Sequence, residues 1–169
     1  MRKFSKLFIC SGILYFIGVS LGILMGLSVK QTSTDIVNQP NILPSIYFAI
    51  ELMKHNGMVA IIVMLGIFTF AVPTVILLVS NGFSLGYIIA RNYVRGVSVV
   101  QICLRILPHG TTEIIAFIVA GVIGLQGVTF YFSKFKKIKF NLKLVAVVSF
   151  LVVISALIEG IVTPILINS

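Results

Sequence analysis

The sequence predicts an all-α protein, a polytopic helical membrane protein with about five transmembrane helices and a broken or short third crossing. Of its 169 residues, 59% are hydrophobic and 10% are charged, and the mean hydropathy is +1.15. A soluble domain of this size needs a polar surface that this composition does not supply. Apolar runs of about 20 residues, flanked by basic residues, indicate the same class. We therefore expect the lipid bilayer to be the solvent of most side chains.

The whole chain, residues 1–169, is expected to form a single integral membrane domain. The expected spans cover residues 7–29, 57–80, 83–106 (broken), 108–128 and 144–166, with an outer loop at 30–56 and a cytoplasmic loop at 129–143. The first apolar run is longer than the core of a typical signal peptide, and no clear A-x-A cleavage site follows it. We interpret it as an uncleaved first helix.

Local signals set the boundaries of the second and third spans. Ser45–His55 has apolar residues on one side and predicts a short amphipathic helix at the membrane interface. Pro73 predicts a kink within the second span, and Asn81-Gly82 predicts a tight turn after it. Phe83–Ala90 is apolar but spans only about 12 Å as a helix, against a hydrocarbon core of roughly 30 Å. The third crossing is therefore expected to be broken or tilted.

Charge distribution predicts the orientation. The formal net charge is +9, from 13 Lys and Arg against 4 Asp and Glu, but the basic residues flank apolar runs. We therefore expect contacts with lipid headgroups and no nucleic-acid partner. Five lysines within ten residues follow the fourth span: Lys134, Lys136, Lys137, Lys139 and Lys143. The positive-inside rule places this loop and the N-terminus in the cytoplasm and the C-terminus outside the cytoplasm.

Small residues recur at a spacing of four in two of the expected spans. They are Gly18, Gly22 and Gly26 in the first span, and Ala116, Ala120 and Gly124 in the fourth. Such strips let two membrane helices approach until their backbones touch. They predict helix packing, but the sequence does not divide this packing between contacts within the chain and contacts between subunits.

A few titratable residues lie within the apolar part of the chain. His109 and Glu113 are four residues apart, on one face of the fourth span. Glu159, in the fifth span, shares a face with Ser155 and Thr163, which we expect to be its hydroxyl neighbours. With the topology above, Glu113 lies about one turn below the outer surface. The candidate polar cluster comprises His109, Glu113, Glu159, Arg91, Arg95 and Arg105, all in the outer half of the membrane.

Three hypotheses account for this cluster. An isolated carboxylate in hydrocarbon costs several kcal/mol, so these groups must be paired, protonated or beside water. Ion pairs between the glutamates and the arginines would fix the register of the helices. A proton or ion pathway is the second hypothesis. The third is a metal site made from His109, Glu113 and Glu159, for which H-x-x-x-E alone is a weak motif.

No residue pattern predicts covalent catalysis. No serine lies in a recognisable nucleophile elbow, and neither Cys10 nor Cys103 has a basic neighbour in the sequence. These two cysteines are too few for a disulfide framework and are expected to be free thiols. We expect no enzymatic activity, no catalytic residue and no cofactor, with a metal-dependent intramembrane activity as a minor alternative.

Three segments resemble the stage II sporulation protein M family of bacterial and archaeal membrane proteins. They are N-G-x-x-L-G at Asn81–Gly86, L-P-H-G-x-x-E with its A-G-x-x-G-L continuation at Leu107–Leu125, and A-L-I-E-x-x-x-T-P at Ala156–Pro164. The resemblance covers the last half of the chain well and the first half in general layout. It implies a multi-pass protein without an established reaction, in which His109, Glu113 and Glu159 occupy the polar positions of the family but have no assigned chemistry.

The family resemblance implies two kinds of function. The namesake anchors cell-wall-degrading partners in the membrane during sporulation, so a non-enzymatic assembly or scaffold role in a larger complex is our first expectation. Relatives in circular-bacteriocin clusters resemble export, maturation or self-immunity components that work beside transporters. The alternative is therefore such a component, with the charge cluster handling substrate or protons. The expected partners are other membrane proteins, among them transporter subunits or cell-wall hydrolases, and a homo-oligomer is an alternative.

Overall fold

The structure, a computed structural model, describes residues 2–29, 43–127 and 138–168, and nearly all of them are helical. The long helices are α1 (Arg2–Ser28), α2 (Ile46–Leu65), α3 (Val72–Val94), α4 (Val99–Gly124) and α6 (Ile138–Leu157). A 3-10 turn, η2 (Gly66–Phe68), extends α2, and a π-helical segment, η3 (Ile158–Val162), joins α6 to α7 (Thr163–Asn168). Within these ranges there is no strand, and five helices are long and apolar enough to cross a membrane. The predicted fold class and number of spans are confirmed.

The second span begins earlier than the sequence predicted. Ser45–His55 is not a separate interfacial helix: Ser45 caps α2, its hydroxyl accepting a hydrogen bond from the Phe48 amide at 3.3 Å, and the helix continues to Leu65. A good N-cap starts a helix wherever the following residues can continue it. The polar residues near His55 do not interrupt α2, so the expected boundaries of the outer loop (30–56) and of the second span (57–80) are wrong.

The signals assigned to a kink and a turn belong to one continuous helix, α3. Pro73 lies in its first turn, where the missing N–H has no helical partner to lose, so it starts the helix and does not kink it. Asn81 and Gly82 lie in the middle of α3, and the Asn81 side chain donates a hydrogen bond to the Leu77 carbonyl at 2.7 Å. The predicted turn at Asn81-Gly82 is therefore wrong.

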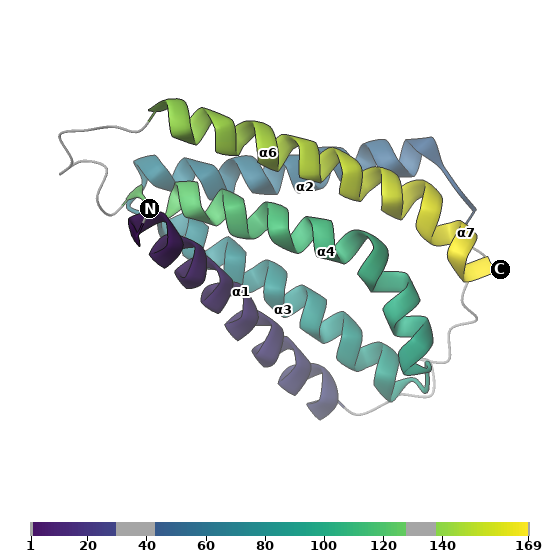
Figure 1. The fold of residues 1–169 in the computed structure, drawn as a ribbon. Helices are drawn as coiled ribbons and strands as arrows, with labels where there is room; N and C mark the ends of the chain where they lie inside the picture. Colours follow the sequence, from purple (N-terminus) through teal and green to yellow (C-terminus); the bar gives the residue numbers. More distant parts are fainter. Residues whose placement is uncertain (1, 30–42, 128–137, 169) are drawn as a thin grey trace.

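The stretch 83–106 is interrupted, as expected, but the interruption separates two spans. It lies at residues 95–98, where Gly96 has a φ of +83°, a conformation that glycine adopts without strain. The fourth span starts at Val99 and includes Pro108, and α4 bends over its first third (Figure 1). The last span starts at Ile138, before the expected position 144. Lys134, Lys136 and Lys137 lie outside the described residues.

The other four spans pack around α4. Figure 1 shows α4 between a pair formed by α1 and α3 and a pair formed by α2 and α6, and α4 contacts all four of these helices. Half of the α4 span is buried, against 22–28% for each of the other spans. Large side chains that are fully buried in this packing include Phe117 of α4 and, from the helices around it, Leu78, Val63 and Val148. The N- and C-termini lie at opposite ends of the bundle (Figure 1), as an odd number of crossings requires.

Both strips of small residues pack inside the chain. A Cβ atom at Gly18 or Gly22 of α1 would collide with the backbone carbonyl of Val79 or Phe83 in α3. In the reverse direction, a Cβ at Gly82 or Gly86 of α3 would collide with the backbone of α1. Gly26 faces the Ala90 side chain at the end of the same interface. The α1 strip is thus one half of a two-sided glycine interface.

The second strip lies at the centre of the bundle. Ala116 and Ala120 have no exposed surface, and a Cβ at Gly124 would meet the Val63 carbonyl and the Thr74 hydroxyl. The Thr74 hydroxyl itself donates a hydrogen bond to Val63 O at 2.7 Å. These residues let α4 approach α2 and α3 closely. Both strips are therefore used for packing within the chain.

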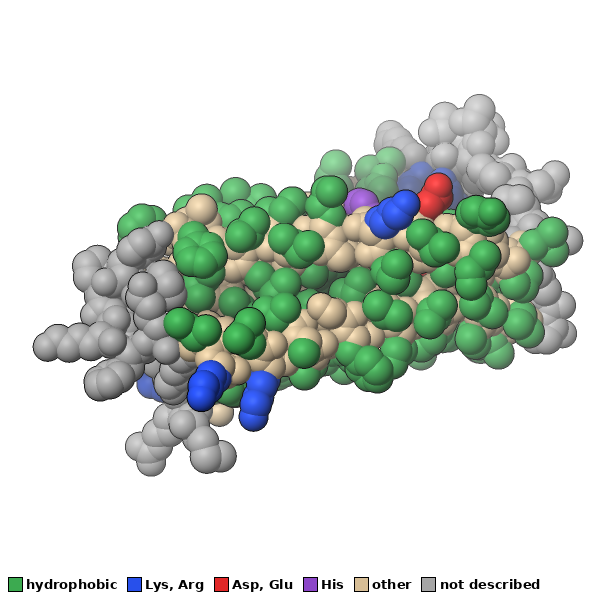
Figure 2. All heavy atoms as spheres, turned by 90° about the horizontal axis from the view of Figure 1, so that it is seen from above, with side chains coloured by type: hydrophobic (Ala, Val, Ile, Leu, Met, Phe, Trp, Pro, Cys, Tyr) green, Lys and Arg blue, Asp and Glu red, His purple; other side chains and the backbone are tan. Residues whose placement is uncertain are grey.

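The outer surface of the bundle is apolar along its length. Figure 2 shows hydrophobic side chains covering one face, with Lys, Arg, Asp and Glu side chains gathered toward the two ends. Large side chains such as Leu24, Ile61 and Phe150 are more than half exposed. In water such a surface would drive aggregation, whereas lipid tails solvate it. This distribution is that of a multi-pass membrane protein.

Candidate functional site

A cavity of about 450 Å³ lies within the bundle, lined by residues from all five spans. Its volume is in the range of sites that take a small ligand. Its polar lining consists of Tyr15, His55, Asn56, Asn81, Ser84, Asn92, Arg105, His109, Glu113, Glu159 and Thr163. Polar side chains on helices that otherwise carry apolar residues are the usual mark of an intramembrane site.

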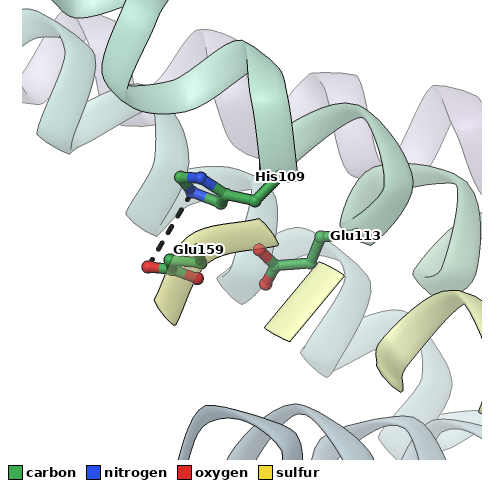
Figure 3. Close-up of side chains that lie close together, drawn as sticks. All are labelled: His109, Glu113 and Glu159. Carbon is green, nitrogen blue, oxygen red and sulfur yellow. Dashed lines mark ion pairs between the residues drawn. The ribbon is translucent and has the colours of Figure 1, made fainter. Parts of the chain in front are cut away.

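Three titratable side chains converge in this cavity. His109 and Glu113 project from α4, and Glu159 projects from η3, so that the three side chains point toward one another (Figure 3). His109 Nε2 lies 3.8 Å from Glu159 Oε1. One nitrogen of His109 and one oxygen from each glutamate lie within 4.8 Å of one another. The structure thus joins the three residues that the sequence placed on two separate spans.

The position of the cluster along α4 differs from the prediction. Because α4 begins at Val99, Glu113 lies near the middle of the helix, about 21 Å from its first residue, and not one turn from its start. The side chains of His109 and Glu159 are 14% and 25% exposed, so both are mostly buried but remain accessible from the cavity that they line. The cluster lies deeper along α4 than the sequence suggested.

Glu159 owes its place to a local departure from α-helical geometry. The π-helical segment Ile158–Val162 widens the last span at this point, and such segments occur often at functional sites. Gly160 within it lets the backbone approach Ala49 of α2, whose Cβ would be only 2.6 Å from a side chain there. The Gly160 carbonyl also accepts a hydrogen bond from the Ser45 amide at 2.9 Å. The carboxylate is therefore carried by a segment fixed on the start of α2.

The sequence suggested that the hydroxyl groups of Ser155 and Thr163 lie beside the carboxylate of Glu159. In the structure both hydroxyl groups contact His109 instead. Thr163 Oγ1 lies 3.5 Å from His109 Nδ1, which leaves Nε2 directed at Glu159. Ser155 donates a hydrogen bond to the His109 carbonyl at 3.1 Å, and Thr112 donates to the same carbonyl at 2.7 Å. Ser155 and Thr163 are buried, so they hold both the backbone and the ring of His109.

The three arginines of the predicted cluster have different places. Arg105 lines the cavity, and its Nε atom is buried without a hydrogen-bond partner among the described residues. Arg91 donates a hydrogen bond to the Val29 carbonyl, at the end of α1, at 2.9 Å, and neither Arg91 nor Arg95 lines the cavity. In the described part of the chain, Glu113 and Glu159 form no ion pair with an arginine.

This arrangement restricts the chemistry of the cavity. Two carboxylates close together in a medium of low dielectric cannot both be ionised without a neighbouring cation. A shared proton, a bound cation or a cationic part of a substrate can each supply the missing positive charge. One histidine and two carboxylates are also a ligand set that transition metals such as zinc and iron accept.

Several lining residues were not predicted from the sequence. His55 had been assigned to the membrane surface, and Asn56, beside it, is buried. Asn81, Ser84 and Asn92 form a polar stripe on one face of α3, at spacings that a continuous helix over Val72–Val94 brings together. That periodicity was a usable signal. The assumed break at Asn81-Gly82 concealed it.

Comparison with known proteins agrees with this architecture. The family described as "Stage II sporulation protein M" matches residues 8–164. An uncharacterized protein of the archaeon Methanocaldococcus jannaschii is 34% identical, over 86% of this chain and 89% of its own length. No solved structure matches the chain. The family match covers most or all of each of the five spans and includes the three cavity residues His109, Glu113 and Glu159. The chain therefore belongs to the stage II sporulation protein M family of membrane proteins.

Proposed function

We propose that this protein is a non-enzymatic membrane component that handles protons or a small cationic substrate in its cavity, within a larger export, maturation or self-immunity system that includes a transporter. One observation carries the proposal. Glu113 and Glu159 meet His109 in a cavity of about 450 Å³, and no arginine is paired with either carboxylate among the described residues.

The electrostatics favour a transport role over a purely architectural one. Ion pairs that fix helix register need an arginine or lysine in contact with each carboxylate, because an unpaired buried charge is destabilising. In the described part of the chain, the basic side chain in contact with Glu159 is the imidazole of His109, which carries a charge only when it is protonated, and Arg105 lines the cavity without forming an ion pair with either carboxylate. A cluster that is short of positive charge attracts protons and cations from the cavity. Intramembrane carboxylates of this kind mark ion and substrate pathways.

An assembly or scaffold role draws less support from the fold. The small-residue strips that were candidates for contacts between subunits are buried between helices of the same chain. A partner would have to bind the apolar outer faces of the spans or the connecting segments. Transporter subunits remain our proposed partners, and wall hydrolases would indicate the scaffold role.

We further propose that the N-terminus is cytoplasmic and the C-terminus is outside. The two termini lie at opposite ends of the bundle, and the start of α6, which carries Lys139 and Lys143, lies at the same end as the N-terminus. With this orientation, basic residues concentrate on the cytoplasmic side. The turn at residues 95–98 then faces outward.

The test separates function from assembly by a single neutral substitution. Glu113→Gln keeps the size of the side chain and removes its charge, and Glu51→Gln, on an exposed face of α2, is the matched control. Each variant replaces the wild-type protein in a deletion strain of the native host, and its partners are identified by mass spectrometry after purification in mild detergent. We expect Glu113→Gln to retain the wild-type partners but to leave the phenotype of the deletion strain uncorrected. A variant that restores the phenotype fully would contradict the proposal.

A further inference from the structure

We infer that the cavity contains a binding site for a divalent transition-metal ion, formed by His109 Nε2 and one carboxylate oxygen each of Glu113 and Glu159. The metal would be the cation that the cavity handles, so this inference rests on the proposed function. The chemical class is that of Zn²⁺, Fe²⁺ or Mn²⁺. One imidazole with two carboxylates suits these ions, whereas Mg²⁺ and Ca²⁺ prefer all-oxygen sites.

The geometry lies close to that of a formed site. The three candidate ligand atoms lie within 4.8 Å of one another, and His109 Nε2 lies 3.8 Å from Glu159 Oε1. Ligands bound about 2.1 Å from a zinc ion lie roughly 3.4 Å from one another in a tetrahedral site. Side-chain rotations of the two glutamates can remove a difference of this size.

The surroundings of His109 resemble the support that metal-binding histidines have. Such a histidine usually uses its second ring nitrogen in a hydrogen bond, which fixes the orientation of the ring. Thr163 Oγ1 lies 3.5 Å from Nδ1 of His109, so Nε2 is the nitrogen that faces the two carboxylates. The Ser155 hydroxyl holds the backbone of His109 from the facing span. These contacts orient the imidazole in the absence of any other ligand.

Charge balance is the second argument. When both are ionised, the two carboxylates carry two negative charges, which one divalent ion neutralises. Among the described residues, no arginine forms an ion pair with either of them. Arg105, which lines the same cavity, makes no ion pair with them. In a medium of low dielectric, neutralisation of this kind stabilises the bound ion strongly. Three protein ligands also leave coordination positions open toward the cavity for water or a substrate group.

Titration of the purified chain with metal ions tests the inference. The full-length protein is purified in mild detergent, stripped with a chelator and titrated with CoCl₂ and then with ZnCl₂. Bound Co²⁺ has visible absorption bands that report its ligands. We expect one Co²⁺ per chain, displaced by Zn²⁺. The affinity should be unchanged in Glu51→Gln and lowered more than tenfold in His109→Ala and in Glu159→Gln.

A second variant keeps the test valid if one substitution prevents folding. If His109→Ala does not fold, as judged by circular dichroism and size-exclusion chromatography, the conservative Glu159→Gln gives the comparison. A folded wild-type protein that binds neither Co²⁺ nor Zn²⁺, or binding that all three variants retain, overturns the inference.

The metal inference and the proposed function fail in different ways. If the wild-type protein binds no metal but Glu113→Gln fails to restore the phenotype, the metal inference is wrong and the proposed function stands, with protons or an organic cation as the ligand. If metal binds at this site but Glu113→Gln restores the phenotype, the metal inference stands and the proposed function is wrong.

Discussion

A single histidine side chain shows how the site is organised at the scale of residues. The ring of His109 is placed between the hydroxyl of Thr163 and the carboxylate of Glu159, which contact its two different nitrogens. The sequence predicted that His109 and Glu159 lie close together, because the expected topology put both in the outer half of the membrane, but it assigned Thr163 to Glu159. It did not predict which nitrogen faces which partner, because that depends on the π-helical turn at Ile158–Val162.

Thr163→Val is expected to disturb the site without removing a candidate ligand. Valine keeps the shape of threonine but cannot form a hydrogen bond with Nδ1, so the ring orientation is less restricted. We expect the affinity for Co²⁺ to fall by about 10–100-fold, as for other residues that support a metal-binding histidine. Thr163→Ser, which keeps the hydroxyl, should retain most of the affinity. Equal affinities in the two variants would show that the hydroxyl does not position His109.

At the scale of elements, the sequence predicted which residues are helical more reliably than where each helix starts. Apolar runs and basic flanks identify membrane spans, because hydrocarbon admits few alternatives to a helix. The boundaries of each helix depend on local residues that are compatible with more than one structure. Glycine at position 82 is compatible with a turn, but it also permits close helix packing, and the presence of α1 opposite it decides the outcome. Similarly, Pro73 can kink a helix or start one.

The interface between α1 and α3 gives a prediction at this scale. Gly22→Ala adds a methyl group that would collide with the Phe83 carbonyl, a backbone atom that cannot rotate away. We expect the two helices to separate slightly and the free energy of unfolding to fall by about 1–3 kcal/mol, the usual effect of overpacking. Thermal unfolding in mild detergent, followed by circular dichroism, measures the change.

The matched control for this substitution lies on α2. Gly57 has no atom within 4 Å of an added Cβ, so Gly57→Ala meets open space within a helix. Alanine is favoured over glycine in a helix interior by about 0.5–1 kcal/mol, so this variant should be as stable as the wild type or more stable. Equal destabilisation by the two alanines would contradict the packing described for the α1–α3 interface.

At the scale of the whole molecule, the packing of four spans around a central α4 brings the polar residues of distant segments into one cavity. Composition alone predicted the class, because a chain that is 59% hydrophobic has to be solvated by lipid. The cavity could not be predicted in full. Its lining depends on which faces of α2 and α3 turn toward α4. Apolar residues on these helices occur both on the faces exposed to lipid and on the faces packed against other helices, so hydrophobicity alone does not distinguish the two.

The orientation of the bundle gives the prediction at this scale. In a variant without Cys10 and Cys103, a single cysteine is placed at Val99, an exposed residue at the start of α4, or at Lys136, before α6. We expect a membrane-impermeant maleimide to label Val99→Cys in intact cells and to label Lys136→Cys only after lysis. Labelling of Lys136→Cys from outside intact cells would reverse the proposed orientation.

In the proposed function, the two cavity carboxylates serve a ligand and do not hold the fold together. The thermal unfolding midpoints of Glu113→Gln and of the wild type, measured in mild detergent with excess chelator, distinguish these two roles. Without an arginine partner, neutralising Glu113 removes repulsion from Glu159, so we predict an unchanged midpoint or a rise of up to about 4 °C, roughly 1 kcal/mol. A fall of several degrees, partly recovered by a second substitution at Arg105, would show an architectural ion pair and contradict the proposed function.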